Sequence, residues 1–166
     1  KSDYLITTTG GGYYFWYTVT LRFMYHAGQF PSYDTFFEEL KNMPENVVEI
    51  YKKSDAKAAK YADTYQDEPI QYLVGSGNLE DWATCYGMCI MEEMQWMRTR
   101  PISASNFFHG TLEVIDKDTS VILIKGEDRT RPLMDRVENF VHKISAKVTV
   151  FDSRDYELKG ISDEFR

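Results

Sequence analysis

The segment Ile-Gln-Tyr-Leu-Val-Gly-Ser-Gly at residues 70–77 decides the fold. Its apolar half is typical of a short buried strand, and the Gly-Ser-Gly half predicts a tight turn into a helix. The alternation continues downstream with an apolar strand at residues 120–125, a helix pattern at residues 133–144 and a strand at residues 147–151. This order predicts an α/β fold with a parallel sheet, which binds ligands at the carboxyl ends of its strands.

Between the first two of these strands, the sequence predicts a long helix over residues 79–98, with Ser76 or Asn78 as its cap. A short extended piece at residues 102–104, the segment 106–110 and a brief helical stretch that ends near residue 115 follow it. We expect ligand contacts in the loops that leave the carboxyl ends of the strands. These loops are residues 75–77, 126–130 and 152–155.

The first 69 residues have a different, mainly helical pattern. After a short strand at residues 4–7, helices are expected over residues 13–27, 33–41 (with Ser32 as the cap) and 44–65. The helix at 13–27 is apolar nearly all round, which predicts that it is buried or lies at an interface.

Composition and charge exclude several classes of protein. The chain has 166 residues, 43% of them hydrophobic, which is enough for one packed domain and argues against disorder. The net charge of −7 argues against binding to nucleic acid. We see no signal peptide and no apolar run long enough to span a membrane. Cys85 and Cys89 alone make neither a disulfide framework nor a zinc site, so we expect a soluble, reduced, cytoplasmic protein.

Two glycine-containing loops could approach a ligand. Residues 75–77 open a helix, whose N-terminus favours an anion, but the third glycine of a dinucleotide fingerprint is replaced by Glu80. An ordinary tight turn is the alternative. The run Thr7-Thr8-Thr9-Gly10 offers hydroxyl groups for a phosphate, and it is equally compatible with a linker.

Acid–base chemistry has two candidate groups. Glu92 and Glu93 interrupt an apolar helix, and a carboxylate that faces inward there would have a raised pKa suited to proton transfer. The alternative is a pair of exposed carboxylates at a helix edge. His109 lies between Phe108 and Gly110 and is either a catalytic or a hydrogen-bonded structural histidine.

Together these motifs resemble the second half of a double sugar isomerase (SIS) domain. In that family a glutamate on the long helix precedes the histidine of a His-Gly motif by a fixed interval, and Glu93 precedes His109 by the 16 residues of that pattern. The likeness is greatest to the fructosamine-6-phosphate deglycases, from about residue 70 onward. It rests on GSG at 75–77, SNFFHGTLE at 105–113, VILI at 121–124, KGED at 125–128 and RPLMDRV at 131–137.

The resemblance implies a flavodoxin-like, three-layer αβα half-domain at residues 70–166, C-terminally incomplete, after a helical connector from a preceding SIS half at residues 1–69. The implied substrate is an Amadori product, a fructosamine 6-phosphate, which is split into glucose 6-phosphate and an amino acid. Glu93 would move a proton between C1 and C2, and His109 would act in ring opening or as the partnering acid. Gly75, Ser76 and Gly77 would contact the substrate.

The same resemblance implies that neither metal nor cofactor takes part. In the family the histidine can reach into a neighbouring subunit's site, so a homodimer is implied, and the aromatic helix at 13–27 is a candidate for its interface. Two departures matter: the first SIS half, with its phosphate-binding serine/threonine loop, is missing from these residues, and Ile90 stands where aminotransferase-type members have a lysine.

Two alternatives remain open. One is an aldose–ketose isomerase, or the isomerase domain of a glucosamine-6-phosphate synthase. The other is a non-enzymatic phosphosugar-sensing domain of a transcriptional regulator. The Ile90 position weighs against the synthase, and the Glu93–His109 pair weighs against the sensor.

Overall fold

The computed structural model describes residues 11–166, so the strand expected at residues 4–7 and the Thr7–Gly10 run lie outside the described residues. The chain forms two compact units, one of residues 50–157 and one that joins the helices before residue 50 to residues 158–166. The division falls within helix α4 (Met43–Tyr65), whereas the sequence places a boundary after residue 69. The second half of α4 belongs with the sheet because Tyr61 packs edge-on against Phe151 of the last strand.

A four-stranded parallel sheet in the order β2-β1-β3-β4 is the core of the larger unit, which confirms the predicted fold class. In the central strand, Leu73 lies opposite Pro101 on one side and Ile122 on the other. Pro101 lacks an N–H group and is tolerated because β2 is an edge strand. The strands are β1 (Gln71–Gly75), β2 (Thr99–Ser103), β3 (Ser120–Lys125) and β4 (Val148–Asp152).

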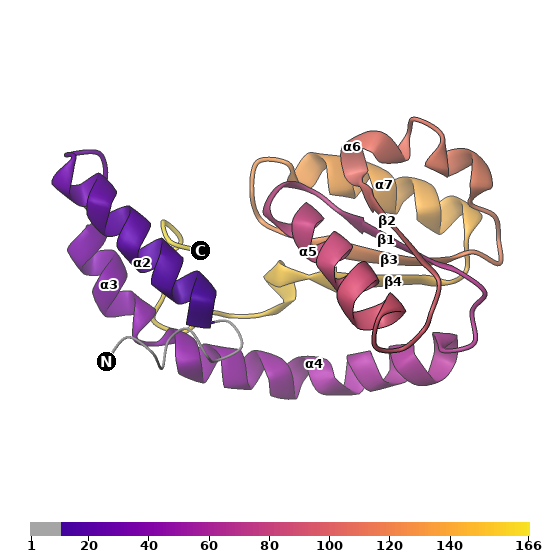
Figure 1. The fold of residues 1–166 in the computed structure, drawn as a ribbon, viewed down its shortest axis with the longest axis horizontal. Coiled ribbons are helices and arrows are strands. Elements are labelled where there is room, and N and C mark those ends of the chain that lie inside the picture. Colours follow the sequence, from indigo (N-terminus) through magenta and orange to yellow (C-terminus); the bar gives the residue numbers. More distant parts are fainter. Residues whose placement is uncertain (1–10) are drawn as a thin grey trace. The chain divides into compact units, whose positions relative to one another are not determined.

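Helices cover both faces of this sheet (Figure 1). On one face, Tyr72 and Val74 pack with Phe107 of α6 (Ala104–Phe107) and Val137 of α7 (Arg131–Ile144). On the other face, Leu73 packs with residues of α5 (Glu80–Cys85) and η2 (Tyr86–Glu92). The single-turn helices are η1 (Gly77–Leu79), η3 (Thr111–Val114) and η4 (Ser153–Asp155).

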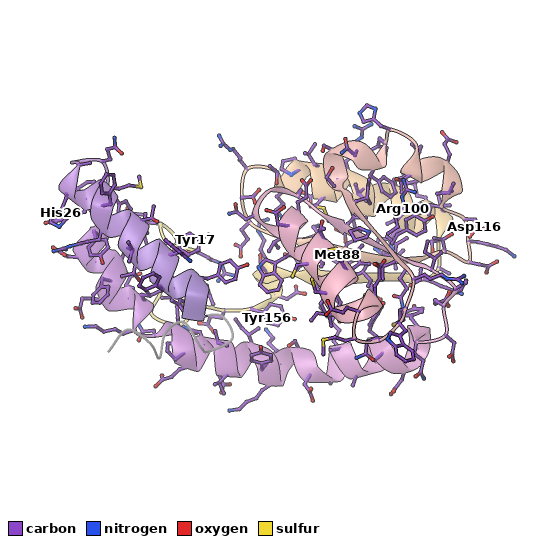
Figure 2. All side chains as sticks on the ribbon, in the orientation of Figure 1. Tyr17, His26, Met88, Arg100, Asp116 and Tyr156 are labelled. Atoms are coloured by element: carbon purple, nitrogen blue, oxygen red, sulfur yellow. The ribbon has the colours of Figure 1, made fainter. Side chains whose placement is uncertain are left out.

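The long helix predicted over residues 79–98 is shorter than expected and changes type. Its second half, η2, is a π-helix, and the helical run ends with Glu92. Trp96 adopts a positive φ of 58°, a left-handed conformation that continues no helix and that usually takes glycine. Met88, on the outer side of η2, is 54% exposed (Figure 2).

The smaller unit consists of α2 (Gly11–His26), α3 (Tyr33–Leu40), the start of α4 and the C-terminal segment. The predicted helices are therefore confirmed, although Ser32 makes no side-chain cap hydrogen bond. Phe165 packs edge-on against Phe30 and Phe36. Several aromatic residues of α2 stay exposed, including Phe23 at 75%, so α2 is not buried within this chain, and its place in an interface remains a prediction.

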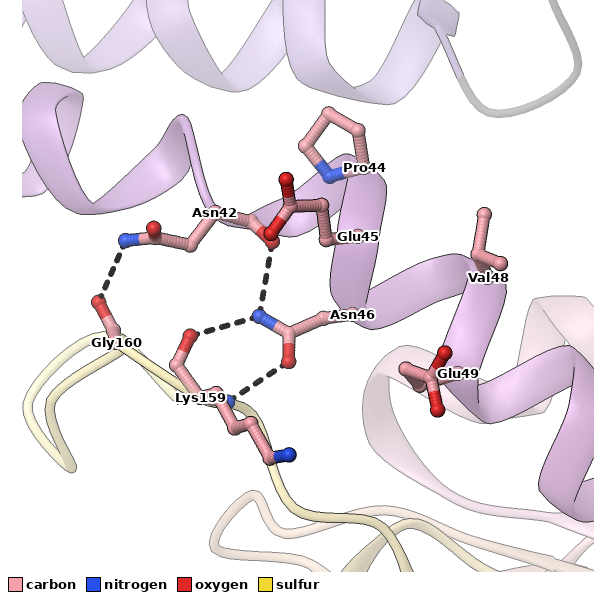
Figure 3. A pocket seen from close by; sticks show the side chains of 8 residues that line it. All are labelled: Asn42, Pro44, Glu45, Asn46, Val48, Glu49, Lys159 and Gly160. Carbon is pink, nitrogen blue, oxygen red and sulfur yellow. Dashed lines mark hydrogen bonds between the residues drawn. The ribbon is translucent and has the colours of Figure 1, made fainter.

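One buried asparagine holds the C-terminal segment on this unit (Figure 3). The Asn46 amide donates to the carbonyl oxygens of Asn42 (3.0 Å) and Lys159 (2.9 Å), and its oxygen accepts the Lys159 N–H (2.8 Å). Asn42 donates to the carbonyl of Gly160 at 3.1 Å. The residues that form these bonds line a pocket of about 590 Å³. Across the described residues, none of the helices has the length and apolarity that a membrane span requires.

Candidate functional site at the sheet edge

The loops expected to bind ligands do share one edge of the sheet. β1, β3 and β4 run parallel, so their carboxyl ends at Gly75, Lys125 and Asp152 lie side by side. The sequence therefore predicted correctly that these loops share one edge of the sheet. The residues in the loops determine which chemistry is available there.

Gly75–Gly77, the predicted substrate-binding loop, is held by the loop after β3. The Asp128 carboxylate accepts the Asn78 N–H at 3.0 Å, and the Thr130 hydroxyl lies 2.9 Å from that of Ser76. Gly77 has a φ of 53°, and a Cβ there would collide with the Asp128 carboxylate. Asp128 thus takes the place of the local cap expected from Ser76 or Asn78: Ser76 is the N-cap of η1 but makes no side-chain cap bond, and the N-cap of α5 is Leu79.

This capping carboxylate sets the charge of the loop. The hydrogen bonds from the Thr130 hydroxyl and then from the Asn78 backbone lower the pKa of Asp128, so the group is ionised at neutral pH. A fixed negative charge at the start of η1 opposes a second anion there. The loop is therefore better suited to neutral hydroxyl groups than to a phosphate.

A cluster of charges lies at the ends of β3 and β4. Lys125, whose side chain is only 5% exposed, contacts the carboxylates of Asp135 (2.7 Å), Glu138 and Asp152 (3.9 Å). A buried ammonium group needs such partners, because removing it from water is costly. The cluster ties α7 to the strand ends.

Arg131 completes this cluster. Its guanidinium binds both carboxylate oxygens of Asp152, one of them at 2.8 Å, and donates to the Gly126 carbonyl at 2.8 Å. The hydrogen bonds from Arg131 lower the pKa of Asp152 to about 2. The sequence pattern pointed to the loop after β4 but indicated no role for Lys125, Arg131 or Asp152. The available signal was that oppositely charged residues end or follow two adjacent parallel strands.

The two adjacent glutamates of the long helix have different surroundings. Glu92 accepts hydrogen bonds from the N–H (3.2 Å) and the hydroxyl (2.7 Å) of Thr99. Glu93, the next residue, accepts no hydrogen bond and forms no ion pair with any residue that the structure describes. Both side chains are exposed in this chain, so neither faces inward. Glu93 is therefore the carboxylate of the pair that is available for chemistry.

His109 is also exposed and lies just after α6. Its backbone N–H donates to the Asn106 carbonyl at 2.9 Å, and Gly110 follows with a φ of 129°. Because α6 packs with α7 on one face of the sheet and η2 packs on the other, Glu93 and His109 belong to opposite layers of one chain. The structure does not bring these two groups together within a single copy.

A cavity of about 730 Å³ lies between α4, η2 and the sheet. Tyr61 and Gln71 form part of its wall, and Tyr61 Oη and Gln71 Oε1 are buried without a hydrogen-bond partner. Burial raises the pKa of the Tyr61 phenol. Neither Glu93 nor His109 lines this cavity. Within residues 11–166, no group of three or more His, Cys, Asp or Glu side chains is arranged to hold a metal ion.

Known structures place this architecture among the SIS phosphosugar isomerase domains. A phosphosugar isomerase structure from Bacillus subtilis matches with a TM-score of 0.75 and 32% identity over 80% of this chain and 40% of its own. One from Salmonella typhimurium matches with a TM-score of 0.76 and 27% identity over 81% and 42%. The C-terminal domain of glucosamine-fructose-6-phosphate aminotransferase from Francisella tularensis shares the fold at 18% identity and a TM-score of 0.65, over 78% and 37%. The chain therefore has the SIS fold.

Comparison with curated sequences shows which SIS proteins this chain resembles. Fructosamine deglycase FrlB of Bacillus subtilis is 32% identical over 154 residues, 90% of this chain and 47% of its own length. Fructoselysine 6-phosphate deglycase of Escherichia coli K12 is 25% identical over 69% of this chain and 34% of its own. No family model matches. The chain is a homologue of the fructosamine deglycases and spans about half the length, or less, of these relatives.

Proposed function

We propose that this chain is part of a cytoplasmic phosphosugar deglycase that splits a fructosamine 6-phosphate into glucose 6-phosphate and an amino acid. The observation that carries the proposal is the 32% identity to a fructosamine deglycase over 90% of the chain. An exposed carboxylate without partners at Glu93, at the spacing from His109 that the family has, supports it. The free thiols Cys85 and Cys89 are compatible with a reducing compartment.

In this proposal Glu93 is the proton shuttle. Its carboxylate removes the C1 proton of the open-chain sugar, which the neighbouring C2 carbonyl acidifies, and an enaminol forms. Return of the proton to C2 gives an imine at C1, and water then releases the amine and leaves glucose 6-phosphate. Glu92 is less suited to this role, because it accepts two hydrogen bonds from Thr99 on its Oε1 atom, which hold the side chain against the start of β2.

His109 would act from a second copy of the chain. A single copy holds Glu93 and His109 on opposite faces of its sheet, so one imidazole can assist one carboxylate only if two copies each contribute a group. A homodimer with two shared sites satisfies this requirement, because a two-fold axis makes both sites equivalent. His109 would then open the sugar ring or supply the partnering acid.

The Gly75–Gly77 loop would contact hydroxyl groups of the sugar through its exposed end at Gly77, because Ser76 is only 5% exposed and its hydroxyl accepts a hydrogen bond from Thr130. The ionised Asp128 beside it disfavours the phosphate, which we assign to a segment outside these residues. An aldose–ketose isomerase is the second candidate, favoured by the likeness to solved phosphosugar isomerases. Both candidates use Glu93 in the same proton transfer and differ in whether an amine leaves.

Product analysis tests the proposal. The full-length polypeptide that contains this sequence is incubated with fructoselysine 6-phosphate, fructose-asparagine 6-phosphate and fructose 6-phosphate. Release of amino acid and glucose 6-phosphate from either Amadori compound is expected. Glu93→Gln should lower turnover about 10²- to 10⁴-fold, while the matched neighbour Glu92→Gln retains it. Sugar isomerisation without amine release would favour the isomerase.

A further inference from the structure

Two cysteine side chains occupy successive turns of the helix that leads to Glu93. Cys85 is the last residue of α5 and is exposed, and Cys89 lies in the π-helical η2 and is partly exposed. Residues four apart lie on the same side of a helix, with about 5–6 Å between their Cβ atoms. Both thiols are reduced, and nothing proposed so far uses them.

The two thiols influence each other. The side-chain hydrogen bond with Cys85, followed by burial and the nearby charges of Cys85 and Glu93, raises the pKa of the Cys89 thiol. The helical spacing of four residues places both sulfur atoms on one side of the helix, and the charge of the Glu93 carboxylate acts on Cys89. This arrangement differs from an isolated surface cysteine, which can offer only one bond.

Geometry decides what such a pair can hold. Two sulfur atoms bound to one tetrahedral centre at about 2.3 Å lie about 3.8 Å apart. Side chains whose Cβ atoms are about 5–6 Å apart reach that separation by rotation about χ1. Soft ligands of this kind select soft, thiophilic centres over hard cations such as Mg²⁺.

We propose that Cys85 and Cys89 form a chelating dithiol site for a soft, thiophilic centre, for which a trivalent arsenical is the probe. Phenylarsine oxide would exchange its As–O bonds for two As–S bonds. The two thiol protons leave with the oxygen as one water molecule, and no atom is oxidised or reduced. The phenyl group on the bound arsenic lies one turn before Glu93 and screens that carboxylate.

Binding is measured first and needs no catalytic activity. Intact-mass analysis of the full-length polypeptide with phenylarsine oxide should show one arsenic bound at this pair, released by an added dithiol but not by an equimolar monothiol. Cys85→Ser and Cys89→Ser should each weaken binding about 100-fold, because the second As–S bond of a chelate forms intramolecularly. Helical circular dichroism of both variants should match the parent chain. Parent-like binding by either single variant would overturn the proposal.

The effect on turnover rests on the proposed function and is measured separately. Phenylarsine oxide should inhibit the parent protein and leave the Cys85→Ser/Cys89→Ser double variant unaffected. Glu93→Gln should bind the arsenical as the parent does. If Glu93 were not catalytic, Glu93→Gln would keep its turnover while chelation stayed intact. If the dithiol site were absent, chelation would fail whatever Glu93 does. Chelation without inhibition would contradict the screening of Glu93.

Discussion

Glu92 accepts two hydrogen bonds from Thr99, one from its backbone N–H and one from its hydroxyl. These bonds join the end of η2 to the first residue of β2, and they leave the adjacent Glu93 as the free carboxylate. Glu92 therefore holds the end of the helix in place, and the position of Glu93 depends on this attachment.

This division of roles predicts different stabilities for two variants. Glu92→Ala should lower the free energy of unfolding by about 1–2 kcal/mol, because hydrogen bonds to a charged group are lost. Glu93→Ala should change it by less than about 0.5 kcal/mol, as for other surface substitutions. Urea unfolding of both variants measures the difference. Equal destabilisation by the two changes would contradict the assignment.

The contact between Gly77 and Asp128 predicts non-additive substitutions. Gly77→Ala adds a Cβ at a φ of 53° and places it against the Asp128 carboxylate, so the cost combines backbone strain of about 1–2 kcal/mol with a steric clash. Asp128→Ala removes the clash with the carboxylate, whereas the backbone strain and the close approach to the Thr130 hydroxyl remain. The cost of Gly77→Ala should therefore be smaller in an Asp128→Ala background, as a double-mutant cycle in urea can show. Strict additivity of the two changes in unfolding free energy would mean that residues 77 and 128 do not interact.

Asp152 predicts how stability depends on pH. Arg131 lowers the pKa of its carboxyl from 3.8 to about 2. The unfolded chain therefore takes up this proton at a higher pH, so the ion pair contributes fully above about pH 4 and loses its contribution as the pH falls toward about 2. Asp152→Asn should be less stable than the parent at pH 7 and should show a weaker pH dependence between those values. Asp63→Asn, at an exposed position on α4, is the control and should behave like the parent.

The buried Asn46 predicts which amides lose protection when it is removed. Asn46→Ala leaves the N–H and carbonyl of Lys159 without their partner, at a cost of about 2 kcal/mol to the smaller unit. Hydrogen exchange should accelerate at Lys159 and at Ser162, whose N–H donates to Glu39. Amides of β3 should be unaffected. Asn139→Ala, at an exposed position, is the matched control. Unchanged hydrogen exchange at Lys159 in Asn46→Ala would contradict the role of Asn46 in holding the C-terminal segment.

Local patterns in the sequence were sufficient for the parallel sheet and for most of its elements, although β2 begins at Thr99 and not at residue 102. The run at 70–74 and the run at 120–125 are continuous and apolar because both faces of a parallel sheet are covered. The end of the long helix was not predictable in this way. Trp96 takes a left-handed conformation that sequence patterns associate with glycine, and the π-helical turns of η2 have no composition signal of their own.

The arrangement of the candidate site depends on contacts between residues far apart in the chain. The Asp128 carboxylate accepts the Asn78 N–H, and Arg131 forms an ion pair with Asp152. No local pattern predicts these pairs, because each forms only when strands and loops are already in place. The opposite layers of Glu93 and His109 follow from the packing of η2 and α6, which the spacing of 16 residues does not reveal.

The most direct test of the shared site uses two inactive variants of the full-length polypeptide. Equal amounts of the Glu93→Gln and His109→Ala chains are mixed and refolded together, and turnover of an Amadori 6-phosphate is measured. If each site takes Glu93 from one copy and His109 from another, hybrid dimers regain one intact site and the mixture should reach about a quarter of parent turnover. A mixture no more active than the two variants alone would contradict the shared site.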